Sequence, residues 1–386
     1  MLLIQNRKAF WVQTAAGLGL LIAGVYFVNA IHASLVTRGI TSGFGFLDRS
    51  TGWDVAFSLI PYTINDSYGR VILVGLLNTM FMGAIGLFFA TLFGIVIGTM
   101  RISANPVISF MGTCYVEAMR NIPLILQVIF WYSIYIHLPP PRQAVQVLDL
   151  VMFSARGIFI PGLNVTSAGA LIALALFMCG VIISIFLASL PRKTLAARVN
   201  LPKLASISLL LGVGSSIVAL FIGRNPGLPL LQVAELQGLN FKGGIRVSPE
   251  FAALLTGISL YGGAFVGEIV RAGFLSVGRG QIEAAQALGL TRAQVLTKVR
   301  LPLAVRMALP TLTNQYVWLL KATTLGIAVG FSDLFMVIST SINQSGQTLE
   351  LIAILMVSFL VLNNALAAVM NFINRRVALR GTQVRM

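Results

Sequence analysis

Four charged side chains lie inside otherwise apolar stretches, and they are the residues of this sequence best placed to do chemistry. They are Glu117, Arg120, Glu268 and Lys321. A charge near the centre of a bilayer costs about 2.5–3.5 kcal/mol on insertion scales, so each of them needs a partner or a function. Together they offer acceptors for an ammonium group and donors for a carboxylate. These residues are therefore candidates to line a pathway for a polar solute.

A second interpretation of the same charges is structural. Glu117 and Arg120 are three residues apart and Glu268 and Arg271 repeat that spacing, so each pair can meet on one helix face. Side chains of this kind can also reach water at the cytoplasmic boundary and only hold helices together. Pro123 interrupts the apolar run that carries the first pair, and because broken helices often line transporter cavities, this break favours a site.

The basic segment 271–309 predicts two short helices joined at a glycine. A short amphipathic helix is expected over 281–288, and Gly289 is placed to end it. Thr291 is placed to cap a second helix that runs to Leu301-Pro302. Such a hairpin either docks on a partner protein or lies on lipid headgroups. The apolar face of the first helix would consist of Ile282, Ala285 and Leu288.

Enzymatic chemistry on this chain is not expected. The sequence contains no Gly-Lys dipeptide and so no phosphate-binding P-loop, and it has neither a His-Glu-x-x-His motif nor a nucleophile elbow. Its two cysteines, Cys114 and Cys179, both lie in apolar runs, which argues against a disulfide framework or a metal site. We therefore predict no catalytic, cofactor-binding or metal-binding residues, and any ATP must be bound by another chain.

Composition shows which elements must position these residues. Hydrophobic residues make up 57% of the 386 and charged residues only 10%, against roughly 25% charged in a soluble domain. The sequence therefore predicts an all-α, polytopic transmembrane helical bundle with about eight spans. The first run could instead be a secretory signal, but its length favours a retained helix. The apolar runs are 12–31, 71–99, 107–136, 168–190, 204–222, 250–270, 310–332 and 350–371.

The distribution of charge predicts the orientation of the bundle. Loops on the side of the N-terminus carry 17 Lys and Arg residues and the opposite loops carry 8, with Arg120 and Lys321 inside spans. Positive residues collect in cytoplasmic loops, so we expect both termini to be cytoplasmic. Because the net charge of +16 follows this topology, it does not indicate a nucleic-acid partner.

The spacing within 283–302 resembles the EAA loop of ABC-importer permease subunits. Glu283-Ala284-Ala285 is followed after three residues by Gly289 and after nine more by Val299, and Leu301-Pro302 closes the motif. In that family the loop docks into a groove on the ATP-binding subunit. The resemblance implies this coupling role for Glu283, Ala284, Ala285, Gly289, Leu301 and Pro302.

Flanking motifs resemble the polar amino-acid branch of the same family, over roughly 70–137 and 249–372. The extra N-terminal helix and the insert at 138–248 resemble the large subunits of general L-amino-acid importers. An acid commonly follows the lysine of the last motif, but this chain has Ala322 there, which puts an ion pair at that point in doubt. The matching stretches are Gly75-Leu76-Leu77-Asn78-Thr79, Tyr115 to Leu124, Gly262 to Arg271, Thr313-Asn314-Gln315 and Leu319-Leu320-Lys321.

This resemblance implies a non-catalytic permease subunit with the fold of an ABC type I importer transmembrane domain. It would import L-amino acids of broad specificity across a bacterial inner membrane. Its partners would be membrane lipid, two ATP-binding subunits that use ATP and magnesium, a second permease chain (identical or different) and a periplasmic substrate-binding protein. The open alternatives are an ATP-independent secondary transporter or channel, and a structural membrane scaffold.

The motifs and apolar runs also predict five regions along the chain. Residues 138–248 would be an insert with periplasmic loops and two extra transmembrane helices, absent from short members of the branch. The others are 1–70 (first helix and periplasmic segment), 71–137 (first part of the permease core), 249–372 (second part, with the coupling loop) and 373–386 (basic cytoplasmic tail).

Overall fold

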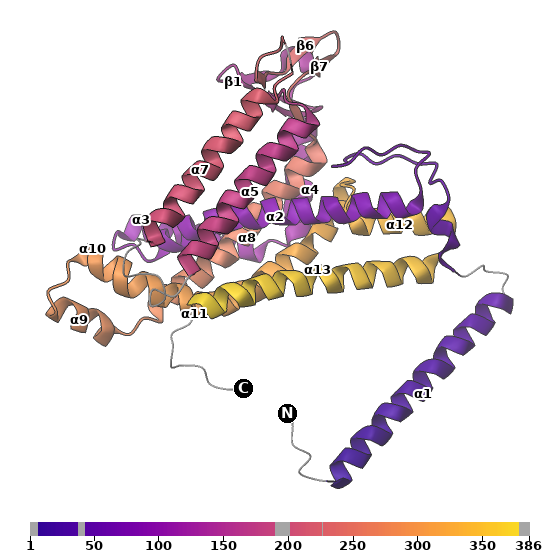
Figure 1. Cartoon of the computed structure of the whole chain (residues 1–386), viewed down its shortest axis with the longest axis horizontal. Helices are drawn as coiled ribbons and strands as arrows, with labels where there is room; N and C mark the ends of the chain where they lie inside the picture. The colour runs from indigo at the N-terminus through magenta and orange to yellow at the C-terminus, as the bar shows by residue number, and fades with distance from the viewer. Residues whose placement is uncertain (1–6, 38–42, 190–200, 226, 378–386) are drawn as a thin grey trace. The chain divides into compact units, whose positions relative to one another are not determined.

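The computed structural model describes residues 7–37, 43–189, 201–225 and 227–377 (Figure 1). The chain divides into two compact units, one formed by 1–129 with 254–386 and the other by 130–253. Most of the described residues are helical, as the sequence predicts, and the strands are confined to the second unit. The strands were not predicted, and "all-α" is therefore correct for the first unit only.

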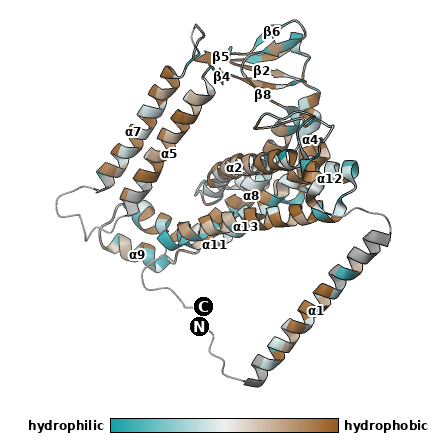
Figure 2. Ribbon diagram, turned by 45° about the vertical axis from the view of Figure 1, so that its right-hand side comes forward, coloured by the Kyte–Doolittle hydropathy of each residue, from teal (hydrophilic) through white to brown (hydrophobic). Residues whose placement is uncertain are grey.

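Long apolar helices dominate the first unit. Figure 2 shows hydrophobic residues along most of α2, and many residues of this helix are buried in the first unit. The helices with residues in this unit are α1 (Arg7–Thr37), α2 (Tyr68–Arg101), α3 (Pro106–Asn121), α4 (Leu124–Ile136), α8 (Pro249–Leu275), α9 (Arg279–Ala287), α10 (Arg292–Val295), α11 (Leu301–Ala322), α12 (Leu334–Ser345) and α13 (Thr348–Val377), with 3-10 helices η1 (Phe44–Asp48) and η4 (Thr323–Val329) and the π-helix η3 (Leu296–Arg300).

Close packing of α2 against α8 explains the glycines that recur along α2. A Cβ on Gly98 would lie 2.7 Å from Val270 Cβ and 2.8 Å from the carbonyl oxygen of Gly267. Real Cβ contacts are never that short, so only glycine lets the two backbones approach this closely. Gly83, Gly86, Gly94 and Gly98 are all buried, so this face of α2 packs against other helices.

Four described helices are long and apolar enough to cross a membrane, and two bent helix pairs raise the number to six. The bent pairs are α3 with α4, at 100°, and Arg292–Val329 with α12, at 51°. The first break falls at the Pro123 interruption that the sequence predicted. The runs predicted at 12–31 and 168–190 contain shorter apolar stretches, Trp11–Tyr26 and Ala168–Ser184.

Eight spans with both termini cytoplasmic therefore stay a prediction. Part of the charge argument also falls outside the described residues, since Arg192, Lys193, Arg198, Arg380 and Arg385 lie there, as does most of the predicted 373–386 tail. The helix that carries the apolar run 310–332 begins before that run, because η3 continues into α11 without a break and the helix is already formed at Leu301.

The second unit contains small antiparallel sheets between helices. The largest has four strands in the order β1-β2-β3-β8, and β4-β5 and β6-β7 form two-stranded sheets. Its elements are η2 (Pro141–Gln143), β1 (Val145–Val147), β2 (Val151–Ser154), β3 (Gly157–Ile160), β4 (Gly162–Leu163), α5 (Ser167–Ser189), α7 (Leu201–Ile222), β5 (Leu231–Gln232), β6 (Glu235–Gln237), β7 (Asn240–Lys242) and β8 (Ile245–Val247).

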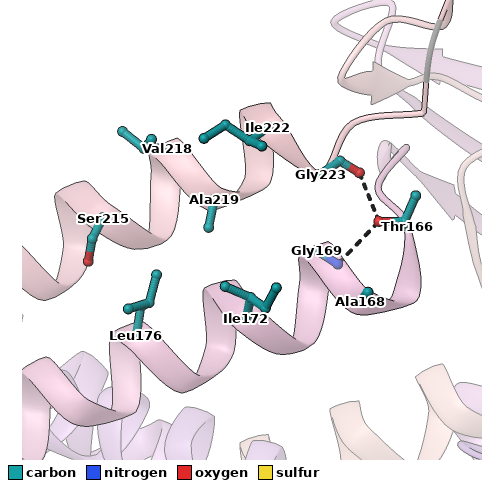
Figure 3. A pocket seen from close by; sticks show the side chains of 10 residues that line it. All are labelled: Thr166, Ala168, Gly169, Ile172, Leu176, Ser215, Val218, Ala219, Ile222 and Gly223. Carbon is teal, nitrogen blue, oxygen red and sulfur yellow. Dashed lines mark hydrogen bonds between the residues drawn. The ribbon is translucent and has the colours of Figure 1, made fainter.

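Helices α5 and α7 form a tightly closed hairpin (Figure 3). A Cβ on Gly180 would lie 2.6 Å from the Cα of Gly212, so the two backbones touch. At the open end, the Thr166 hydroxyl donates to the Gly223 carbonyl at 3.1 Å and accepts from the Gly169 amide at 3.1 Å. Just outside the hairpin, the Asn225 amide nitrogen donates to the Asn164 carbonyl at 3.1 Å.

Candidate functional site

The end of α9 has the geometry that the sequence predicts. Gly289 adopts φ +80°, and its N–H donates to the Gln286 carbonyl at 2.9 Å, while the Leu290 N–H reaches back to the Ala285 carbonyl at 3.2 Å. These two bonds form a Schellman motif, which ends a helix at a left-handed residue. Nothing lies within 4 Å of a Cβ built on Gly289, so this position favours glycine because of its positive φ and not because of crowding.

The start of the next helix is also confirmed. The Thr291 hydroxyl accepts from the Gln294 amide at 3.3 Å, and the Gln294 side chain accepts from the Thr291 amide at 3.0 Å, which is a complete capping box. The predicted separate second helix was wrong, because α10 widens into the π-turn η3 and continues into α11. Pro302 lacks an N–H, and a widened turn just before it accommodates that missing hydrogen bond.

The short helix α9 presents one face to the permease core and another to solvent. Ala285 is 5% exposed, and Ile282 packs against the cluster of Phe274, Val277 and Ala304. This cluster joins the end of α8 to the start of α11. Glu283, Ala284 and Gly289 are exposed, and Leu301 is 43% exposed. Pro302 is half-buried.

One residue of α9 departs from the predicted apolar face. Leu288 is 82% exposed, because it is the C-cap residue and the chain turns away from the core there. The sequence assigned this side chain to the inner face, yet it is among the most exposed large apolar side chains of the described residues. The sequence held one warning of this exposure. Leu288 directly precedes the helix-ending Gly289, and a residue at that position no longer follows the helical periodicity.

Glu268 is the centre of a charge cluster at the end of α8. Its carboxylate accepts from Arg271 Nη2 at 2.5 Å and pairs with Arg101 on its other oxygen. The predicted Glu268–Arg271 pair is thus confirmed. Arg101, the last residue of α2, was treated as a loop cation, and its role was missed because the partners are 167 positions apart. The cluster ties the end of α2 to α8.

The predicted Glu117–Arg120 pair was wrong. Within the described residues no ion pair joins them, and both side chains are exposed. The Arg120 guanidinium instead lies 5.1 Å from the centre of the Phe265 ring, on α8. A guanidinium over an aromatic face is attracted by the ring's quadrupole, so the neighbouring helix rather than the i+3 spacing sets this contact.

Lys321 lies apart from Glu268, in a cavity of about 470 Å³ between α11 and α13. Carboxamides share this cavity: Asn314 of α11, and Asn363 and Asn364 of α13. Glu268 lines a different cavity, of about 360 Å³, with Ser276 and Thr311 among its neighbours. The four candidate pathway residues are therefore not gathered into one pocket.

A buried polar cluster lies where α2 meets the start of α12, and the sequence pointed to Asn78 and Thr79 only as part of a family motif. Asn78 Nδ2 donates to the carbonyls of Phe57, at 2.8 Å, and Ser332, at 2.7 Å. The Thr79 hydroxyl accepts from the Leu334 amide at 2.9 Å, and Asp333 caps α12 by accepting from the Met336 amide at 2.9 Å. These bonds fix the loop before α12 on α2.

Comparison with known proteins places the chain in a family. Residues 247–379 match the family described as "Binding-protein-dependent transport system inner membrane component". YhdX of Escherichia coli strain K12, which carries the name of an amino-acid ABC transporter permease protein, is 38% identical over 361 residues, which cover 93% of this chain and 91% of that protein.

Two further relatives match along nearly their whole length. The general L-amino acid transport system permease protein AapQ of Rhizobium johnstonii is 36% identical, over 93% of this chain and 90% of that protein. The glutamate/glutamine/aspartate/asparagine transport system permease protein BztB of Rhodobacter capsulatus is 30% identical, over 98% of this chain and 96% of that protein. The chain belongs to this family, as a permease subunit of an amino-acid ABC transporter.

Proposed function

We propose that this permease imports L-amino acids of broad specificity, including polar and charged ones, across the bacterial inner membrane. The permease role itself follows from the family. The breadth is supported by the names of two relatives, one a general L-amino acid permease and the other a permease for four acidic and amide amino acids. These relatives give no support to an ATP-independent secondary transporter.

Coupling to ATP is proposed to act through α9 and the turn that follows it. The observation that carries this proposal is the exposed surface of Glu283, Ala284 and Leu288 on a helix whose other face is anchored in the core. A partner that moves this surface moves the cluster of Phe274, Val277 and Ala304, and with it α8 and α11. Rigid-body movement of such elements is a common way to switch between states.

The complete transporter is proposed to contain two ATP-binding subunits, a second permease chain and a periplasmic binding protein. This chain would hold no cofactor, and ATP with magnesium would bind on the partner subunits. It would cross the membrane eight times, with both termini cytoplasmic and the ABC type I importer fold.

The substrate pathway is proposed to use Glu117, Arg120, Glu268 and Lys321. Two of them are supported most directly. Glu117 is an exposed carboxylate on the first half of a broken span, and Lys321 shares its cavity with three carboxamides. An exposed charge of this kind is costly against lipid, so it fits better against an aqueous pathway.

Purification of the intact complex from native membranes in mild detergent tests this proposal. Mass spectrometry should find an ATP-binding subunit twice per complex and show whether a second permease chain is present. The same complex in liposomes, with its binding protein, should take up several radiolabelled L-amino acids only when ATP is present. Uptake without ATP by a complex that lacks an ATP-binding subunit would overturn the proposal.

A further inference from the structure

The strand-rich part of the second unit contains a cavity of about 530 Å³ that the transport proposal does not use. Its charged and polar lining comes from separate elements: Arg142 of η2, Gln146 of β1, Asp149 of the β1–β2 turn and Glu235 of β6. None of these residues belongs to a helix that could span a membrane. The volume lies in the usual range for small-molecule sites, about 300–1,000 Å³.

The floor of the cavity is apolar and well packed. Phe159, Ala234 and Phe241 form a buried cluster, and the rings of the two phenylalanines have centroids 4.7 Å apart. Met152 packs against this cluster and, with Phe241, lines the cavity. A floor of this kind accepts the hydrocarbon part of a ligand without rearrangement.

The charges at the rim do not neutralise one another. Among the residues that the structure describes, the ion pairs are formed by Arg70, Arg101 and Arg271, with Asp66 and Glu268 as their acids. Arg142, Asp149 and Glu235 form none.

One of the two acids has a neighbouring cation. Lys242 stands directly opposite Glu235 in the β6–β7 register, where opposite charges attract. The rim thus offers one cation, Arg142, and two carboxylates: Glu235, which has Lys242 opposite it, and Asp149, which lies in the β1–β2 turn.

The turn between β1 and β2 determines where that carboxylate lies. Leu148 and Asp149 have φ values of +53° and +55°, and the Leu150 amide donates to the Val147 carbonyl at 3.1 Å. Two left-handed residues in a row define a type I′ turn, in which Asp is far better tolerated than Leu. The backbone therefore holds Asp149 at the rim whether or not a ligand is present.

We propose that this cavity binds a free α-amino acid. Arg142 receives the α-carboxylate, Asp149 receives the α-ammonium group, and the side chain of the amino acid lies over Met152 and Phe241. Paired recognition of this kind accepts different side chains, because the charged groups are common to all amino acids. The site is separate from the pathway through the bundle, and its existence does not depend on the transport proposal.

Hydrogen exchange with mass spectrometry on the full-length chain in lipid nanodiscs, with no partner subunit, tests the site. L-leucine is compared with 4-methylpentanoate, which lacks the ammonium group, and with 3-methylbutylamine, which lacks the carboxylate. We expect L-leucine alone to slow exchange in peptides covering 142–152 and 233–241. Arg142→Gln and Asp149→Asn should each weaken the effect at least about tenfold.

The choice of one test variant and one control variant keeps the result specific. Asp149→Asn removes the charge but suits the left-handed turn, so it tests the carboxylate rather than the fold. Arg156→Gln removes an arginine of the β2–β3 turn that does not line the cavity, and should leave binding unchanged. Equal protection by the two analogues, no protection by L-leucine, or protection that appears only when the binding protein is added would overturn the proposal.

Discussion

Two helices of the permease core carry a glutamate followed three residues later by an arginine, and the two pairs behave differently. On α8, Glu268 and Arg271 form an ion pair that Arg101 of α2 completes. On α3, Glu117 and Arg120 form none, and the arginine turns to the Phe265 ring of α8. A spacing on one helix permits a pair, but the groups that the next helix brings decide whether it forms. The α8 carboxylate is therefore held by two cations of the protein itself, whereas the α3 carboxylate has no ion-pair partner among the described residues.

Replacing the central carboxylate of the α8 cluster should have the largest effect. Glu268→Gln leaves the Arg101 and Arg271 guanidiniums together without a counter-ion, which should cost about 1–3 kcal/mol. We expect a lower midpoint of thermal unfolding and uptake reduced at least about tenfold in liposomes. Glu268→Asp, which keeps the charge, should recover part of both. A Gln variant as stable and active as the wild type would remove the structural role from this cluster.

A change at Gly289, in the turn that ends α9, should act on coupling rather than on the stability of the bundle. Gly289→Val forces a β-branched residue to φ +80°, at a cost of about 1–2 kcal/mol, and should displace α9. ATP-driven uptake should fall roughly tenfold, and co-purification of the ATP-binding subunit should decrease. Gly289→Asn is the matched control, since Asn tolerates this conformation. If the Val variant transports as well as the Asn variant, the turn has no coupling role.

The α3 pair gives the contrasting test. Glu117→Gln should leave thermal unfolding unchanged, because the carboxylate is exposed and has no ion-pair partner among the described residues. Uptake should nevertheless fall about threefold to tenfold, with a higher KM, because one charge-assisted contact to the substrate is lost. A drop in stability without a change in KM would place Glu117 with Glu268 as a structural residue.

The smallest effect is expected at the contact that replaced the predicted α3 pair. Phe265→Leu removes the ring face under Arg120, a contact that should contribute about 0.5–1 kcal/mol, together with ring contacts to Tyr261 and Trp318. We expect a small decrease in the unfolding midpoint in differential scanning calorimetry. In a double-mutant cycle, Arg120→Gln should cost about 0.5–1 kcal/mol less in the Phe265→Leu background than in the wild type. Full additivity of the two changes would show that the side chains do not interact.

The sequence could predict features that depend on a few consecutive residues. Gly289 and Thr291 were assigned their helix-ending and helix-capping roles correctly, because both roles are set by local backbone geometry. Pro123 likewise indicated the break between α3 and α4. The Glu268–Arg271 pair could also be predicted, because both residues lie on one helix three positions apart.

The sequence could not predict what distant segments bring together. Arg101 meets Glu268 only through the packing of α2 on α8, and no local pattern records that contact. The strands of the second unit have two to four residues each, too short for an alternating pattern to be recognised. Leu288 was misplaced because its exposure depends on where α9 ends, not on its spacing.

The hydrogen bonds between Asn164 and Asn225 mean that the two chain segments that lead into and out of the α5–α7 hairpin lie side by side. Both a backbone bond and a 2.9 Å side-chain bond join these two residues. Excising everything between them would leave chain ends that a minimal turn could rejoin. Removal of this hairpin should therefore leave the strands around it in place. Its two helices pack on each other through their own glycine contacts, Gly180 with Gly212 and Gly169 with Gly223.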